Sequence, residues 1–343
     1  MLRLAALFAL LGLAAATFVV VRSGFSDVLH ALGVAGWGIV LTSVYHMISL
    51  AASTVGWRAL MPGKKRPGFW YLLYVMWLRS SVNNLMPVAR IGGEIVAVRV
   101  MMKRGLRKTV AVASTVGELT ISVLAVFLFD VVGIGLFLLR VADSNIGWKL
   151  AGSMLLALPP IAGLIVVQKF GFFGTLDKMF KLMFRESWTK FTGSAAQLDR
   201  AVHAMYRRKK QILLCFVWVL AGWTAGIGEV ALGLHFLGFP ISFASCFMLE
   251  ALVQAASNAA FVVPGALGVQ EAGFLLFGQM LGLPPDIAVA LAVIRRCRDV
   301  LLLTPGLIAW QIQEGRWLLG RGKVKNTRHS GESGNDSFFQ WRG

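Results

Sequence analysis

The chain has 343 residues, of which 57% are hydrophobic and 15% are charged, whereas soluble domains carry about 25% charged residues. Lys and Arg together number 34 and Asp and Glu 16, which gives a formal net charge of +18. This composition excludes an ordinary soluble domain. The basic residues cluster in short loops between continuous apolar runs, which is typical of cytoplasmic loops of a helical membrane protein and not of a nucleic-acid-binding surface or a β-barrel.

The first apolar run covers residues 4–22 and follows Arg3. It stays apolar beyond its only small-residue stretch, at 14–16, so it predicts an uncleaved anchor helix rather than a signal peptide. The loop that follows holds Asp27 and His30 but no Lys or Arg. We therefore expect this loop to face away from the cytoplasm and the N-terminus to be cytoplasmic.

A second helix is predicted over 36–60 and ends at a basic loop. The next segment, 69–102, is apolar through Trp77 and then becomes polar and glycine-rich over 83–94. Basic residues flank this segment on both sides, which predicts that both of its ends face the cytoplasm. The pattern indicates a re-entrant helical hairpin whose break lies near the middle of the membrane.

The centre of the chain contains two further predicted helices, 109–140 and 147–168. Residues 169–210 are basic and mixed, and we expect them to lie in the cytoplasm. Within this segment, residues 170–185 alternate aromatic and basic side chains. That pattern suits an amphipathic helix on the membrane surface or a helix packed against loops of the protein itself, and both interpretations stay open.

The second half of the chain repeats the behaviour of the first. A helix is predicted over 211–236, and the segment 243–282 is again apolar with a polar, glycine- and proline-containing interruption. No Lys or Arg flanks this segment, so both of its ends should face outward. A last helix, 287–311, returns to a basic cytoplasmic tail, of which residues 321–343 are polar and predicted to be disordered.

The predicted fold is thus an all-α membrane protein with about six full transmembrane helices and two re-entrant helical hairpins in an inverted repeat. Residues 1–320 form the transmembrane domain, in which repeat one covers about 36–140 and repeat two about 211–315.

The repeat is visible as a shift of 177 residues, which places Pro87 on Pro264 and Glu94 on Glu271. From Pro87 to Leu124, 11 of 38 pairs are identical, whereas chance at this composition gives about three. The loop charges predict opposite orientations for the two copies. Inverted repeats with broken helices are typical of secondary transporters, and the free N–H groups at half-helix N-termini favour anions.

Ionisable side chains at membrane depth are costly and usually functional. The acidic candidates include Glu229 and Glu250, and under the shift Glu118 falls on Arg295, so that symmetric positions carry opposite charge. One interpretation of this is a Glu–Arg pair across the pseudo-twofold axis. In one interpretation the arginines face a cavity and hold a lipid phosphate. In the other, the charges neutralise each other and only fix helix packing. The predicted substrate-binding residues are Arg90, Glu94, Glu118, Glu271, Arg295, Arg296, Arg298, Asn84 and Asn258.

No motif for catalysis, metal binding or phosphate binding by a P-loop occurs in the sequence. The three cysteines have no CxxC spacing and are expected to pack among apolar residues. His46 and His235 are expected to be hydrogen-bonded packing residues. The sequence therefore predicts no enzyme activity, no metal and no cofactor.

Two stretches carry recognisable motifs: residues 84–94 (Asn-Leu-Met-Pro-Val-Ala-Arg-Ile-Gly-Gly-Glu) with Arg99 and Gly105, and residues 261–273 (Phe-Val-Val-Pro-Gly-Ala-Leu-Gly-Val-Gln-Glu-Ala-Gly) with Arg295, Arg296 and Asp299. They resemble the two signatures of the flippase-like integral membrane family, which includes the translocase half of bacterial lysylphosphatidylglycerol synthases. A weaker similarity is to stand-alone members associated with hopanoid biosynthesis. The resemblance implies a lipid translocase whose central cavity is lined by Arg90, Glu94, Glu271, Arg295 and Arg296. Unlike the full synthases, the sequence has no soluble aminoacyltransferase domain after the last helix, so lipid lysylation is not expected.

The first functional hypothesis is therefore a multi-pass transporter of the bacterial inner membrane, with both termini cytoplasmic, that moves an anionic lipid between leaflets. The alternatives are a membrane scaffold for a lipid or hopanoid biosynthetic pathway and an enzyme acting on a lipid phosphate. Expected partners are a lipid with an anionic headgroup, a second copy of the chain or an enzyme of lipid synthesis, and no nucleic acid.

Overall fold

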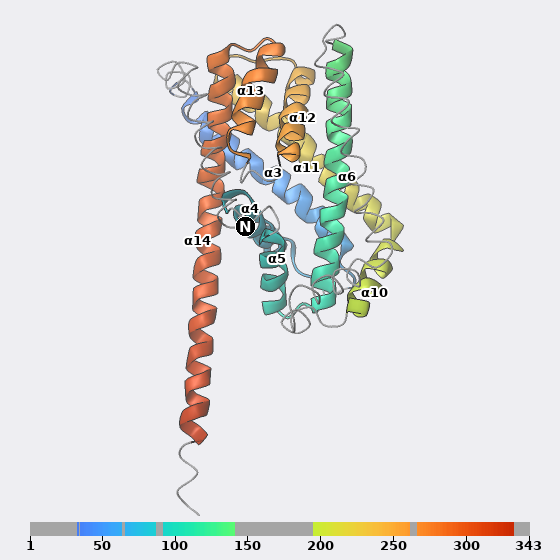
Figure 1. Cartoon of the computed structure of the whole chain (residues 1–343), viewed down its shortest axis with the longest axis vertical. Helices are drawn as coiled ribbons and strands as arrows, with labels where there is room; N and C mark the ends of the chain where they lie inside the picture. Colours follow the sequence, from blue (N-terminus) through green and yellow to red (C-terminus); the bar gives the residue numbers. More distant parts are fainter. Residues whose placement is uncertain are drawn as a thin grey trace, which may run out of the picture.

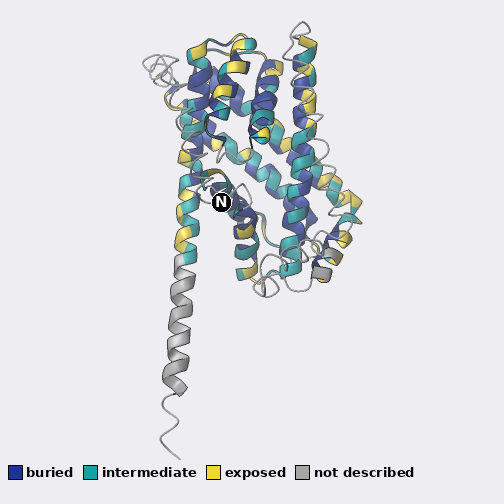
Figure 2. Cartoon of the chain, viewed as in Figure 1, coloured by how far each residue is buried: buried dark blue, intermediate teal, exposed yellow. Residues whose placement is uncertain are grey.

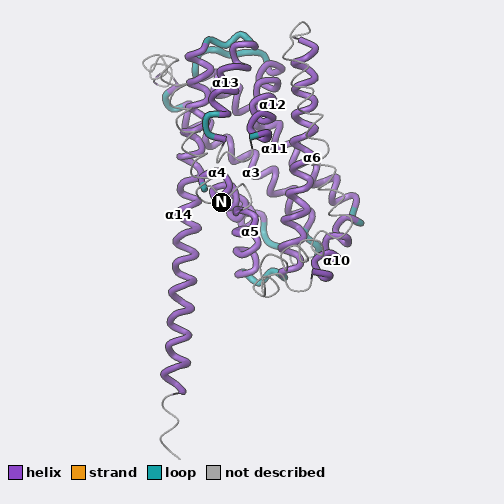
Figure 3. The backbone as a smooth tube through the Cα atoms, viewed as in Figure 1, coloured by secondary structure: helices purple, strands orange, loops and turns teal. Residues whose placement is uncertain are grey.

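The computed structural model describes residues 33, 35–63, 66–86, 92–140, 195–260 and 266–332. Within these ranges every regular element is an α-helix and there is no strand, as the backbone tube in Figure 3 illustrates. The predicted helices at 4–22 and 147–168, and the alternating segment 170–185, lie outside the described residues.

Three described helices are long and apolar enough to cross a membrane. They are α3 (Gly38–Leu60), α6 (Lys108–Arg140) and α11 (Lys209–Phe236). Their bounds differ by at most two residues from the predicted ranges, because apolar runs without proline end at charged or proline-containing loops. The chain is accordingly a multi-pass membrane protein of the all-helical class.

Two pairs of shorter helices form the hairpins. The first pair, α4 (Phe69–Leu85) and α5 (Gly92–Lys103), packs together in the lower part of the helix bundle, above the end of α14. The second pair, α12 (Phe243–Ala259) and α13 (Val269–Met280), packs together near the upper end (Figure 1). Each predicted polar interruption thus coincides with the break between two packed helices.

Two described helices remain. Helix α10 (Ala195–Tyr206) packs on α6, and α14 (Pro285–Glu332) contacts both hairpins. Trp77 Nε1 of α4 donates to the carbonyl of Leu302 at 2.7 Å. The sequence predicts a disordered tail from Arg321, whereas α14 continues to Glu332. No proline follows Pro305 in this helix, so the backbone can remain helical through the polar sequence.

The element bounds repeat with the same 177-residue shift as the sequence. This shift converts the bounds of α5 into those of α13 and the start of α6 into that of α14. Gly105 and Gly282 follow α5 and α13 with φ of 86° and 91°, a left-handed conformation that glycine adopts without a Cβ penalty. In Figure 1, α6 and α14 run in opposite directions.

The burial pattern is that of a protein surrounded by lipid. Buried residues gather where helices meet (Figure 2), and many buried side chains are charged. Large apolar side chains are exposed instead along the outer faces of α3, α6 and α11. Since lipid does not drive apolar side chains inward, polar and small residues can form the interior contacts. Among the described residues, the structure therefore places seven carboxylates, together with Arg79 and Arg298, inside the helix bundle.

Candidate functional site

A polar cavity of about 250 Å³ lies among α3, α4, α6, α11, α12 and α14. Both hairpins contribute to it through α4 and α12. Apolar side chains, including Leu50, Met76 and Trp223, form part of the wall. The polar residues that line the cavity are His46, Ser49, Ser53, Arg79, Ser80, Asn83, Asn84, Glu118, Ser122, Glu229, Glu250 and Arg295.

Arg79 of α4 is the central cation on the first-hairpin side of the cavity. Its guanidinium pairs with Glu118 of α6 through Nη1, and its Nε lies 2.7 Å from Oε2 of Glu94 on α5. Asn83 of α4 also binds the start of α5. Its side-chain amide donates to Glu94 at 3.3 Å, and its side-chain oxygen accepts from the Gly93 N–H at 2.8 Å. One buried cation thus joins both helices of the first hairpin to α6.

Arg295 of α14 is the cation on the second-hairpin side of the cavity. Its Nη1 and Nη2 donate to the two oxygens of Glu250 on α12 at 2.5 and 2.6 Å, a forked arrangement. The third donor group, Nε, is buried and has no hydrogen-bond acceptor among the described residues. The cavity wall therefore contains a guanidinium that one carboxylate satisfies only in part.

A second charged group extends from the cavity wall into the bundle. Glu229 of α11 accepts from Arg298, and His46 Nδ1 of α3 lies 2.8 Å from Glu229. Arg298 also binds Asp299, with Nε at 3.0 Å from Oδ1. This network connects α3, α11 and α14.

A separate ion pair lies at the start of α13. Arg296 Nε donates to Glu271 at 2.6 Å, and the other Glu271 oxygen accepts from the Gly268 N–H at 2.8 Å at the start of α13. Arg296 also donates to the Ala266 carbonyl at 3.3 Å. These residues hold the chain directly after the break and do not line the cavity.

The structure distributes the predicted binding residues over three places. Asn84, Glu118 and Arg295 line the cavity, while Glu94 and Arg298 each contact a residue in its wall. The remaining described ones lie elsewhere: Glu271 and Arg296 after the second break, and Asn258 against Asp130. Arg90 lies outside the described residues.

The pairing of Glu118 with Arg295 differs from the prediction. Both line the same cavity, but Glu118 pairs with Arg79 and Arg295 with Glu250. Arg79 was not among the predicted residues, although a lone basic side chain within an apolar helix is a signal that could have found it. His46 is hydrogen-bonded as predicted and also contributes to the cavity wall.

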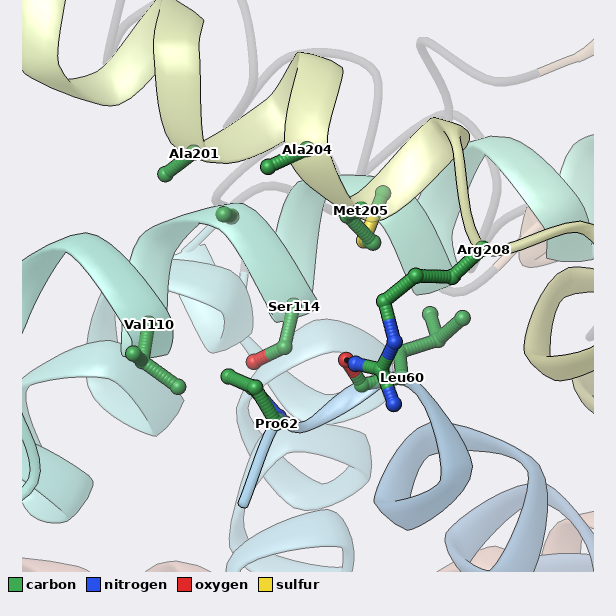
Figure 4. Close-up of a pocket in the computed structure, with 9 residues that line it drawn as sticks. Leu60, Pro62, Val110, Ser114, Ala201, Ala204, Met205 and Arg208 are labelled. Atoms are coloured by element: carbon green, nitrogen blue, oxygen red, sulfur yellow. Dashed lines mark hydrogen bonds between the residues drawn. The ribbon is translucent and has the colours of Figure 1, made fainter.

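A second, smaller cavity of about 160 Å³ lies where α10 meets the end of α3 and the start of α6, as Figure 4 shows. Ala201, Ala204 and Met205 face Val110 and Ser114 across it, and the Arg208 guanidinium donates to the Leu60 carbonyl at 3.2 Å. Its lining is mainly apolar and offers no group of charges for recognising a ligand.

Comparison of the sequence with known protein families gives a match to one family. A family model described as "Lysylphosphatidylglycerol synthase TM region" matches residues 5–306. The match includes both hairpins and every residue that lines the polar cavity. No curated protein matches the chain.

Proposed function

This chain belongs to the family of the lysylphosphatidylglycerol synthase TM region, and we propose that it is a lipid translocase. In this proposal it moves a phospholipid with an anionic headgroup between the leaflets of the bacterial inner membrane. The polar cavity receives the headgroup, and the acyl chains stay in the lipid outside the bundle.

The observation that supports this proposal best is the cavity itself. A membrane-embedded bundle whose outer faces are apolar encloses a space lined by two guanidiniums, three carboxylates, a histidine and several hydroxyl and amide groups. Such groups are costly at membrane depth unless they serve a polar ligand or a conformational change. A purely structural set of charges would not need an open space between them.

The chemistry of the wall suits a phosphate group. Arg295 offers a buried Nε–H without an acceptor, and a guanidinium can bind a phosphate through parallel hydrogen bonds. In the structure, Glu250 accepts from Nη1 and Nη2 of Arg295, and Glu118 and Glu94 pair with Nη1 and Nε of Arg79. A headgroup phosphate would therefore replace a carboxylate at one arginine, which converts lipid binding into a change of ion-pair partners.

This exchange gives a route to alternating access. The Arg79 pairs hold α4, α5 and α6 together, and the Arg295 pair holds α12 and α14 together. Loss of either set frees one hairpin to move relative to its long helix. In inverted-repeat transporters, one repeat moves against the other around a fixed central site, and the 177-residue correspondence of the elements suits that motion.

The experiment uses the full chain in vesicles that contain a fluorescent phosphatidylglycerol, with accessibility to a membrane-impermeant quencher as the measure of flipping. The variant Glu250→Leu with Arg295→Met removes both charges of one pair, since replacing a buried pair with apolar residues often preserves stability. We expect a folded protein whose flipping falls to the rate of protein-free vesicles. Arg99→Gln, whose side chain is 41% exposed on α5, is the matched control and should flip lipid like the unaltered protein.

Unchanged flipping in the folded double variant would remove Arg295 from the mechanism. Absence of flipping by the unaltered protein, together with co-purification of a stoichiometric enzyme of lipid synthesis, would favour the scaffold hypothesis instead.

A further inference from the structure

One buried carboxylate differs from all the others that the structure describes. Seven carboxylates in the described residues are buried: Glu94, Glu118, Asp130, Glu229, Glu250, Glu271 and Asp299. Each of the other six has an arginine within ion-pair distance. Asp130 has none among the described residues, although its exposure is only 4%. The negative charge of Asp130 is therefore not balanced by an ion pair as the charges of the other six carboxylates are.

The hydrogen-bond network next to Asp130 consists of uncharged amide side chains. Its Oδ2 accepts a hydrogen bond from the Asn258 amide at 3.3 Å, and Asn258 in turn accepts from Gln254 at 3.1 Å. Its Oδ1 is buried and has no hydrogen-bond partner among the described residues. Aromatic and small residues complete this face of α6, since Phe129 packs on Phe247 and Gly133 lies against Ala251.

The charged groups on neighbouring elements do not balance Asp130. On α12 the group that acts on it is Glu250, which is negative itself and is held by Arg295. On α11, Glu229 is held by Arg298 and His46. On α6 itself, Arg140 donates to Ser245 and Glu118 pairs with Arg79.

Its depth makes an ionised form of Asp130 costly. About 15 Å of helix separate Asp130 from Arg140 at the end of α6, which is roughly half of a hydrocarbon core of about 30 Å. A lone carboxylate at such a depth loses its hydration without gaining a cation, and a buried acid then becomes neutral by taking up a proton.

We propose that Asp130 is a proton-binding site. Its hydrogen bond to Asn258, one residue before the end of α12, makes this end of the helix sensitive to the proton. When the end of α12 moves away from α6 and admits water, Asp130 releases the proton and gains hydration, and when the two helices pack again, Asp130 takes up a proton. Coupling of this cycle to lipid movement rests on the proposed translocase function, whereas proton binding itself does not.

Infrared difference spectroscopy tests proton binding directly. Spectra of the full chain in lipid nanodiscs at pH 7 are compared with those of Asp130→Asn. We expect the difference to contain the C=O stretch of a protonated carboxyl, shifted on exchange into heavy water. The difference against Asp286→Asn, a residue in the first turn of α14, should lack that band. Carboxylate bands alone in the Asp130 difference would overturn the proposal, as would a carboxylate band that responds to sodium.

If Asp130→Asn fails to fold, the unaltered protein labelled with carbon-13 at its aspartate carboxyls gives the same answer, because the labelled band is displaced from those of glutamate. The presence of a labelled protonated carboxyl at pH 7 supports the proposal, and its absence overturns it.

Flipping under an imposed pH gradient tests the coupling. We expect the unaltered protein to flip lipid several times faster in one direction of the gradient than in the other, and Asp130→Asn to flip at the same rate in both. Flipping that ignores the gradient would overturn the coupling but not the translocase function. Absence of all flipping would refute the translocase function and leave the infrared result to decide the proton site.

Discussion

At the scale of single residues, six of the seven buried carboxylates in the described part of the chain pair with an arginine. Arg79 contacts both Glu94 and Glu118, and its guanidinium lies 5.7 Å from the centre of the Trp57 ring. Burying a charge costs several kcal/mol, and its partners offset that cost only while they are present. Each such residue is therefore more important to stability than any exposed pair on the surface.

Removal of Arg79 should consequently destabilise the protein strongly. Arg79→Gln leaves Glu94 and Glu118 buried without a cation, and we expect the free energy of unfolding to fall by about 3–5 kcal/mol. Thermal unfolding in detergent measures the effect. The half-exposed Arg99→Gln serves as control and should cost less than about 1 kcal/mol. Equal losses in the two variants would show that the buried pairs do not stabilise the bundle.

At the scale of elements, the first hairpin depends on a close approach of its two helices. A Cβ on Gly93 would lie 2.3 Å from the carbonyl oxygen of Arg79 and 2.6 Å from Asn83 Oδ1. The backbone of Arg79 could make room for a Cβ only if α4 moved away from α5. The start of α5 therefore requires glycine. In the second hairpin, a Cβ on Gly273 would make only ordinary contacts, at 3.5 Å from Val253.

This difference predicts opposite outcomes for two matched substitutions. Gly93→Ala should destabilise the protein by roughly 1–3 kcal/mol because it overpacks a contact with backbone. Gly273→Ala should be neutral or slightly stabilising, since alanine favours the helix. Melting temperatures of both variants in the same detergent compare them. A tolerated Gly93→Ala would indicate that the two helices of this hairpin can separate at little cost.

At the scale of the whole molecule, two similar units lie in opposite directions. The contact between Arg140 and Ser245 places the end of α6 beside the start of α12, and the loop between α5 and α6 lies at the other end of the molecule (Figure 1). The loop charges predict that the α5–α6 loop faces the cytoplasm and that the start of α12 faces the opposite side.

Labelling of single cysteines in intact cells can test this orientation. We expect Arg107→Cys to react with an impermeant maleimide only after the membrane is opened, and Ala244→Cys to react in intact cells. Both sites are exposed, whereas Cys215 and Cys246 are buried, and Cys297→Ser removes the remaining half-buried thiol. Reaction of both cysteines from the same side would contradict opposite orientation of the two units.

The sequence by itself determined the elements of this protein. Apolar runs bounded by basic loops placed α3, α6 and α11 to within two residues, and polar interruptions located both hairpin breaks. These features are local, because a chain in lipid must satisfy its backbone within each helix, which ties helix bounds to nearby residues. The family was also recognisable from two short stretches.

Only the tertiary structure decided which charges meet. Glu118 and Arg295 correspond under the repeat, yet each pairs with a residue of another element, Arg79 and Glu250. Asp130 carried no signal in the sequence that separated it from the paired carboxylates. Pairing depends on which faces of distant helices approach within a few ångströms, and the sequence spacing of one helix cannot specify the rotation of the next. The polar cavity and the unpaired carboxylate therefore became visible only when the helices were packed.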